Sequence, residues 1–114
     1  MDTLTGKVAI VTGGASGIGK AVAEVLAEAD LMGLVIADID GAEAVAKDIG
    51  RRFDTDAVGV ATDVADSAQV EVMVERALGH FQRIDILVNN AGIAPVVEWP
   101  DVTEANWRHV LDVN

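Results

Sequence analysis

The amino-acid sequence predicts an α/β fold: a doubly wound parallel β-sheet with helices on both faces, organised as one domain over residues 1–114. Short apolar runs alternate along the chain with segments in which apolar residues recur at helical spacing. The runs are apolar at successive positions, as expected of strands that are buried on both faces. Right-handed crossovers between such strands give the spatial order 3-2-1-4. The sequence therefore predicts a sheet of this order, truncated after about four strands.

Each element has its own signal. The strands are expected at residues 7–12, 34–38, 57–61 and 84–88. A helix over residues 17–29 follows from its apolar face, and a weaker second helix ends near Gly50. Asp66 or Ser67 can cap a third helix, and Thr103 can cap a last one. No closing strand is expected after residue 88, which leaves the fourth strand as an exposed edge that invites pairing with another chain.

Composition excludes several classes of protein. The chain is 51% hydrophobic and 24% charged, which is typical of a globular domain, and no apolar run approaches the ~20 residues of a membrane helix. Its net charge of −11 would repel nucleic acid. Without cysteine, and with His80 and His109 lacking companions at metal-ligand spacing, no disulfide or metal site is expected. The first residues lack a secretory signal, so the expected location is the cytoplasm.

A glycine-rich segment, Thr12-Gly-Gly-Ala-Ser-Gly-Ile-Gly19, links the first strand to the first helix. Such a turn directs backbone N–H groups and the positive end of a helix dipole to one place, which favours a phosphate. Gly13 permits the turn, Gly17 allows ligand oxygens to approach the backbone, and Gly19 allows the helix to pack closely on the strand. An acid at the end of the second strand, Asp38, strengthens the interpretation as a dinucleotide site.

The same segment overlaps a second phosphate motif. Residues 14–20 spell Gly-x-x-x-x-Gly-Lys, as in the P-loop of nucleoside triphosphatases. The next residue, Ala21, lacks the hydroxyl by which a P-loop binds magnesium. A nucleoside triphosphatase is therefore disfavoured.

The strand order also predicts where a ligand would lie. The chain reverses direction between strands 1 and 4, which opens a crevice lined by residues 13–19 and by Asn89-Asn-Ala-Gly92. Together with Asp38, Asp63-Val64 and Asn114, these segments agree in order and spacing with the short-chain dehydrogenase/reductase family. The chain resembles this family over its entire length, but it resembles only about the N-terminal half of a typical member.

The resemblance implies a role for each matching residue. In the family the glycine turn holds the pyrophosphate and adjoining ribose of a nicotinamide dinucleotide, and the matching positions here are Gly13, Ser16, Gly17, Ile18 and Gly19. Asp38 would bind the hydroxyls of the adenosine ribose, and Asp63 and Val64 would flank the adenine. The loop after strand 4 would pass beside the ribose through Asn90, Ala91 and Gly92, while Asn89 would tie the sheet together. Asn114 matches an asparagine that supports a water-linked proton relay to a catalytic lysine.

Asp38 also predicts which dinucleotide is bound. A carboxylate accepts hydrogen bonds from both ribose hydroxyls but repels the 2′-phosphate of NADP. No Arg or Lys lies between Thr12 and Gly19 or directly after Asp38 to offset that repulsion. The sequence therefore predicts NAD as the cofactor, in preference to NADP.

Two positions depart from the family's pattern. The family usually has glycine where Asp30 stands and a β-branched residue where Gly33 stands. The turn into the second strand is therefore expected to be distorted or shifted by a residue, which would also move Asp38.

The family's catalytic set, a serine and Tyr-x-x-x-Lys, has no match in this sequence. The chain contains no tyrosine, its serines are Ser16 and Ser67, and its lysines lie at positions 7, 20 and 47. The chain is expected to supply cofactor binding to an oxidoreductase that moves a hydride between NAD and a carbonyl or secondary alcohol, without the acid-base step. The alternative is a non-catalytic chain that self-associates as a homo-oligomer through the exposed edge of strand 4.

Overall fold

The structure is a computed structural model that describes residues 4–90 and 96–98. Strands and helices alternate along the chain as far as the fourth strand, which confirms the α/β class. The elements are β1 (Val8–Thr12), α1 (Gly17–Glu28), β2 (Gly33–Asp38), α2 (Ala42–Phe53), β3 (Asp56–Ala61), α3 (Ser67–Phe81), β4 (Ile86–Asn89) and β5 (Val96–Glu98). Within these ranges no helix has both the length and the apolar character needed to cross a bilayer.

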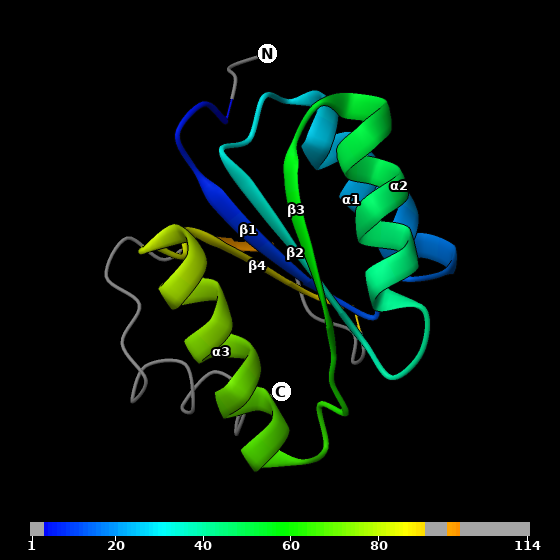
Figure 1. Ribbon diagram of the computed structural model, residues 1–114, viewed down its shortest axis with the longest axis vertical. Coiled ribbons are helices and arrows are strands. Elements are labelled where there is room, and N and C mark those ends of the chain that lie inside the picture. The colour runs from blue at the N-terminus through cyan, green and yellow to red at the C-terminus, as the bar shows by residue number, and fades with distance from the viewer. Residues whose placement is uncertain (1–3, 91–95, 99–114) are drawn as a thin grey trace.

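The strands form one sheet in the order β3-β2-β1-β4-β5, and the first four are parallel, as the sequence predicts. Figure 1 shows α1 and α2 together on one face of this sheet and α3 on the other. Alternate residues of β1 serve the two cores: Val8 and Ile10 pack on the α3 side, whereas Ala9 and Val11 pack on the side of α1 and α2. Every residue of β1 is buried, which explains its unbroken apolar run.

The expectation that no strand follows residue 88 is wrong. β5 pairs antiparallel with β4, from Val88 opposite Val96 to Ile86 opposite Glu98. This pairing occupies the edge of β4 that the sequence leaves exposed. The sequence signal for β5 is only two β-branched residues, Val96 and Val97, between prolines, and so short a run becomes a strand because β4 supplies its hydrogen-bond partners.

The second helix is longer than expected and runs through Gly50 to Phe53. It ends at Asp54, which adopts a left-handed conformation (φ = 53°) and donates its N–H to the carbonyl of Gly50. A Cβ atom at Gly50 would lie 2.9 Å from the carbonyl oxygen of Thr55, so this glycine permits a close backbone approach and does not terminate the helix. The last expected helix, with its cap at Thr103, lies outside the described residues.

The turn into β2 does not shift the strand. Asp30 adopts a left-handed conformation (φ = 66°), and β2 then pairs without interruption with β1 and β3, from Gly33 to Asp38. The ring of Phe81, from α3, fills the space that a side chain at Gly33 would need. Glycine therefore replaces the usual branched residue because an aromatic ring packs directly on the strand, and Asp38 keeps its predicted place.

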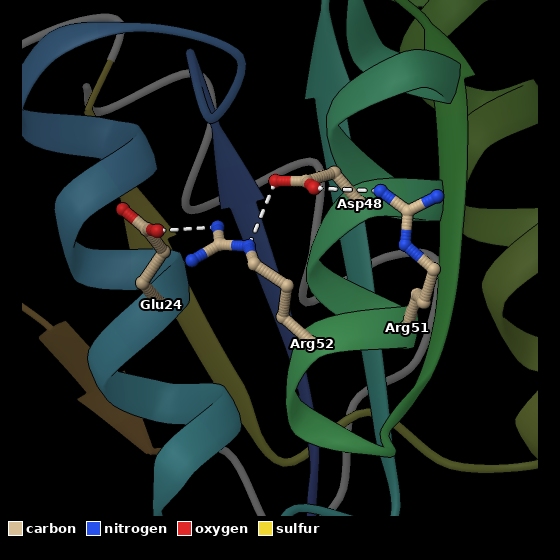
Figure 2. A network of polar contacts seen from close by, with 4 residues as sticks. All are labelled: Glu24, Asp48, Arg51 and Arg52. Atoms are coloured by element: carbon tan, nitrogen blue, oxygen red, sulfur yellow. Dashed lines mark hydrogen bonds and ion pairs between the residues drawn. The ribbon is translucent and has the colours of Figure 1, made fainter.

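The two helices on one face are joined by charged side chains. Figure 2 shows Arg52 of α2 reaching Glu24 of α1 while its Nε donates to Asp48 at 2.9 Å. Arg51 also donates to Asp48, at 3.2 Å. The hydrogen bond that Arg52 donates to Glu24, with the negative charge of Asp48, raises the pKa of Arg52. These contacts hold α1 against α2 and so help to orient the helix that begins at the glycine turn.

Candidate functional site

The carboxyl ends of four strands meet at one end of the sheet. Thr12, the last residue of β1, lies opposite Ala37 of β2 on one side and Asn89 of β4 on the other. Asp38 ends β2 opposite Ala61 of β3. The glycine turn, Asp38 and the start of the loop after β4 therefore lie together, at the position where a doubly wound sheet binds ligands.

The glycine turn adopts a backbone that other residues rarely adopt. Gly13 (φ = 64°) and Gly17 (φ = 56°) are both left-handed. A Cβ atom at Gly19 would overlap the carbonyl oxygen of Gly13 and would lie 2.8 Å from the side-chain nitrogen of Asn90. The sequence predicts that Gly19 allows close packing on the strand; in the structure the close approach is to the turn itself and to the loop after β4.

The N–H groups of the turn fall into two sets. Three of those before the helix are occupied: Gly13 and Gly14 donate to the carbonyl of Ala37, at 2.7 and 3.4 Å, and Ala15 donates to the carboxylate of Asp38 at 3.0 Å. The first intrahelical bond is from Lys20 to Ser16. The N–H groups at positions 17–19 therefore have no intrahelical acceptor, and the side chain of Ser16 does not cap them. Among the described residues, no side-chain cap and no acidic residue of the first turn neutralise the positive end of the α1 dipole.

Asp38 joins the end of β2 to the glycine turn. One carboxylate oxygen accepts from the N–H of Ala15, and the other accepts from the N–H of Ile39 at 2.7 Å. A carboxylate can accept about four hydrogen bonds, so each oxygen keeps a free acceptor site. The side chain is half-buried and lies beside the turn.

Thr12 links the two loops of the crevice, and sequence reasoning missed it. Its hydroxyl donates to the side-chain oxygen of Asn89 at 3.0 Å and accepts from the N–H of Asn90 at 3.1 Å. The side chain of Asn90 in turn donates to the carbonyl of Gly13 at 3.3 Å. The available signal was a hydroxyl residue ending a fully buried strand, because a buried hydroxyl needs a partner. Asn89 ties β4 to β1, as the resemblance implies.

Two exposed apolar side chains border the site. Ile18, in the first turn of α1, is 75% exposed, and Ile39, directly after Asp38, is 72% exposed. Ile18 matches a cofactor position of the family, whereas Ile39 was not singled out from the sequence. The signal for Ile39 was its place next to the acid that ends a strand.

The loop after β3 also reaches this end of the sheet. The N–H of Thr62 donates to the carbonyl of Asp38 at 2.8 Å, which places Asp63 next to the end of β2. The carboxylate of Asp63 accepts from the N–H of Ala65 at 2.9 Å, while Val64 is half-buried against the core under α3. Three further expected residues, Ala91, Gly92 and Asn114, lie outside the described residues.

No group of three or more potential metal ligands is found in residues 4–90 and 96–98. His80 lies instead beside the carboxylate of Asp56, at 3.0 Å, and both side chains are exposed at the other end of β3. His109 lies outside the described residues.

The sequence matches enzymes of known activity over nearly its whole length. A D-threitol dehydrogenase of Mycolicibacterium smegmatis is 42% identical over 115 residues, which cover 97% of this chain and 43% of the enzyme. A glucose 1-dehydrogenase of Bacillus subtilis is 37% identical over 115 residues, which cover 97% of this chain and 44% of the enzyme. The chain thus spans less than half the length of the curated relatives it matches.

Solved structures agree with the fold. L-sorbose reductase of Gluconobacter frateurii, solved with NADPH and L-sorbose, superposes with a TM-score of 0.75 at 34% identity, over 95% of this chain and 42% of the reductase. A short chain dehydrogenase/reductase of Burkholderia phymatum, solved with NAD, gives a TM-score of 0.69 at 36% identity, over 76% of this chain and 31% of that protein. The sequence profile of the family described as short chain dehydrogenase matches residues 7–114. With the open glycine turn and the acid that ends β2, these matches show that the chain belongs to the short chain dehydrogenase family.

Proposed function

We propose that this chain is the cofactor-binding part of an oxidoreductase and that it binds a nicotinamide dinucleotide at the glycine turn. The observation that supports this best is the pairing of two features: open N–H groups at positions 17–19 and a carboxylate, Asp38, hydrogen-bonded to the same turn. The N–H groups suit a pyrophosphate. The carboxylate suits the hydroxyls of the attached ribose. The solved relatives that hold NAD or NADPH support the same ligand class.

The remaining crevice residues would complete the pocket. Thr12 and Asn90 hold the turn against the end of β4, and Asn90, with Ala91 and Gly92 after it, would lie beside the ribose on that side. Asp63 and Val64 would flank the adenine from the loop after β3. The exposed Ile18 and Ile39 offer apolar surface at the same end of the sheet.

NAD is the expected dinucleotide. The free acceptor sites of Asp38 match the 2′- and 3′-hydroxyls of its ribose, whereas the nearly doubly charged 2′-phosphate of NADP would face a carboxylate. Between Thr12 and Gly19 there is no cation to offset that repulsion. The net charge of −11 adds to the cost of a second phosphate group.

In the whole protein the nicotinamide would exchange a hydride with a carbonyl or secondary alcohol, as the relatives' names imply for those enzymes. This chain's own residues would bind and orient the cofactor. Asn114 would support the proton relay, while the serine, tyrosine and lysine of the family's catalytic set are not supplied by this sequence. We therefore expect nucleotide binding without alcohol oxidation by these 114 residues alone.

Calorimetry with NAD, NADP and ADP-ribose tests the proposal. The Asp38→Asn variant keeps an acceptor oxygen for the N–H of Ala15 but loses the negative charge and the second oxygen, which accepts from Ile39. Hydrogen bonds to a charged group are worth about 1.5–3 kcal/mol, so NAD affinity should fall about tenfold or more while NADP affinity does not fall. Asp40→Asn removes the same charge from an exposed neighbour and should leave the NAD:NADP ratio unchanged. Absence of any adenine nucleotide binding at millimolar concentration would contradict the proposal.

Self-association through strand 4 loses its structural basis, because β5 occupies that edge. A homo-oligomer and a cytoplasmic location stay predictions from the sequence. Sedimentation velocity at several protein concentrations tests the first, since a concentration-independent monomer would exclude it.

A further inference from the structure

β3 is the edge strand of the sheet on the side opposite β5, and no other described element pairs with its outer edge. Thr62 donates its N–H to the carbonyl of Asp38 on β2, which fixes the alternation along the strand. In a parallel ladder the residues between the bonded ones direct their N–H and C=O groups the other way. Ala57, Gly59 and Ala61 therefore present their backbone groups outward.

A groove of about 240 Å³ runs along this edge and is lined from both layers of helices. Lys47 of α2 and Arg76 of α3 border it on either side of β3, and its floor includes Ala57 and Gly59. Figure 1 shows β3 between these two helices, with α2 on one side and α3 on the other. Gly59 lets α2 pack closely on β3, because a Cβ atom there would overlap the backbone of Ala42.

The charges of the groove differ from those of the molecule. The chain carries −11 overall, yet the groove has two cations, Lys47 and Arg76, and one carboxylate, Glu43. Neither cation has an ion pair or hydrogen bond with any residue in the described ranges, although Glu43 lies four positions before Lys47. Other cations of the chain are paired with carboxylates, namely Arg51, Arg52 and Arg83.

We propose that the outer edge of β3 binds an extended acidic peptide segment of a partner protein, which adds to the sheet as a further strand. The outward groups of Ala57, Gly59 and Ala61 would form the ladder. Successive side chains of an added strand point to opposite faces, so two consecutive acidic residues would reach Lys47 on one side and Arg76 on the other. A second copy of this chain fits poorly, because edge-to-edge pairing brings the same two cations, Lys47 and Arg76, together with their own copies.

The test uses the chain with a labelled, end-capped peptide of threonine and valine that has two central glutamates. Binding is measured by fluorescence anisotropy and by amide hydrogen exchange, in which Ala57, Gly59 and Ala61 should become protected. An exposed ion pair is worth about 0.2–1 kcal/mol, so Lys47→Gln and Arg76→Gln should each weaken binding about 1.4- to fivefold. Lys20→Gln makes the same change of charge on α1, away from this edge, and should leave affinity unchanged.

A second peptide decides whether the backbone takes part. The same sequence with N-methyl groups on alternate residues cannot complete the ladder, and it should not bind. Equal binding of the N-methylated peptide, or an equal loss in Lys20→Gln, would overturn strand addition in favour of simple charge attraction. No binding at millimolar peptide, or protection of the same three amides by self-association alone, would overturn it as well. None of these results depends on the nucleotide site.

Discussion

The helices α1 and α3 begin in opposite ways. At α3 the carboxylate of Asp66 accepts from the N–H groups of Ala68 and Gln69, so the helix closes its own N-terminus. At α1 the corresponding residue is Ser16, whose side chain makes no such bond. The N-terminus of α3 is therefore capped by a side chain, whereas the N-terminus of α1, at the crevice, is not.

The three helices also differ in the negative charge at their N-termini. α2 lacks a side-chain cap but has Glu43 in its first turn, and α3 has a carboxylate at the cap position. α1 has neither, in a chain with 19 acidic residues. A negative group at a helix N-terminus is stabilising, so a bound anion would supply at α1 the interaction that Glu43 and Asp66 supply at the other two helices. The comparison predicts that substitutions in α1 change ligand affinity, whereas substitutions in α3 change stability.

The largest effect is expected from an alanine at Gly19. Its Cβ would overlap the carbonyl oxygen of Gly13, so the turn and the loop at Asn90 must move. Overpacking of this kind costs about 1–3 kcal/mol, which corresponds to about five- to 150-fold in NAD affinity if the turn bears the strain. Calorimetry measures the affinity, and thermal unfolding measured in parallel separates a displaced turn from an unfolded protein.

Gly79 provides the matched control, because it is a glycine inside α3 with open space around its Cβ position. Alanine there removes backbone entropy from the unfolded chain and should stabilise the protein by about 0.5–1 kcal/mol with NAD affinity unchanged. If both alanines raise stability and neither alters affinity, the distinction between the two helices is wrong.

The contrast between these elements also shows what the sequence could predict. Strands buried on both faces and helices with one apolar face have strong local signals; β1, β2 and α1 were expected within a residue of both ends, and α3 at its start. The glycine turn and Asp38 lie together because parallel strands end at one edge of the sheet. The position of this part of the site follows from topology alone.

What the sequence did not predict depends on contacts between distant residues. β5 has almost no local signal and is a strand only because it pairs with β4. The role of Thr12 needs the loop at Asn90, 78 positions away in the chain. Glycine at position 33 is unusual for a strand, and its cause is the ring of Phe81, which fills the space that a side chain would need. In each case the structure depends on a residue that is distant in the sequence, so the local sequence alone does not predict it.

Asp85 lies at the end of the sheet opposite the crevice, where its negative charge stabilises the fold. Its buried carboxylate accepts from the N–H of Val8 at 2.8 Å and from Arg83 at 2.7 and 2.6 Å. Burial by itself would raise the pKa of Asp85, but these hydrogen bonds and the charges of Arg83 and Lys7 outweigh it and hold the pKa below its usual value. As the pH falls, Asp85 is therefore protonated in the unfolded chain before it is protonated in the folded one.

The stabilisation from Asp85 is fully present above the unfolded pKa of about 3.9 and is lost as the pH falls through the lower folded value. Asp85→Asn should destabilise the protein by about 1–3 kcal/mol near neutral pH and should flatten the loss of stability below pH 4. Urea unfolding between pH 2 and pH 7 measures both. Asp40→Asn removes an exposed carboxylate of the same charge and should keep the acid sensitivity of the parent; equal flattening in both variants would rule out a specific role for Asp85.

The smallest effects come from exchanging the two caps. Asp66→Ala removes the bonds to Ala68 and Gln69 and should cost about 0.5–2 kcal/mol of stability without changing NAD affinity. Ser16→Asp puts a carboxylate at the open N-terminus of α1, so it should stabilise the helix by about 0.3–1 kcal/mol while weakening NAD by repulsion of its pyrophosphate. Ser16→Ala, which loses no cap bond, should leave stability unchanged and controls for the lost hydroxyl. The two helix N-termini differ in function only if Ser16→Asp raises stability and lowers NAD affinity. If this variant raises both stability and NAD affinity, the N-terminus of α1 lacks a cap but is not a phosphate site.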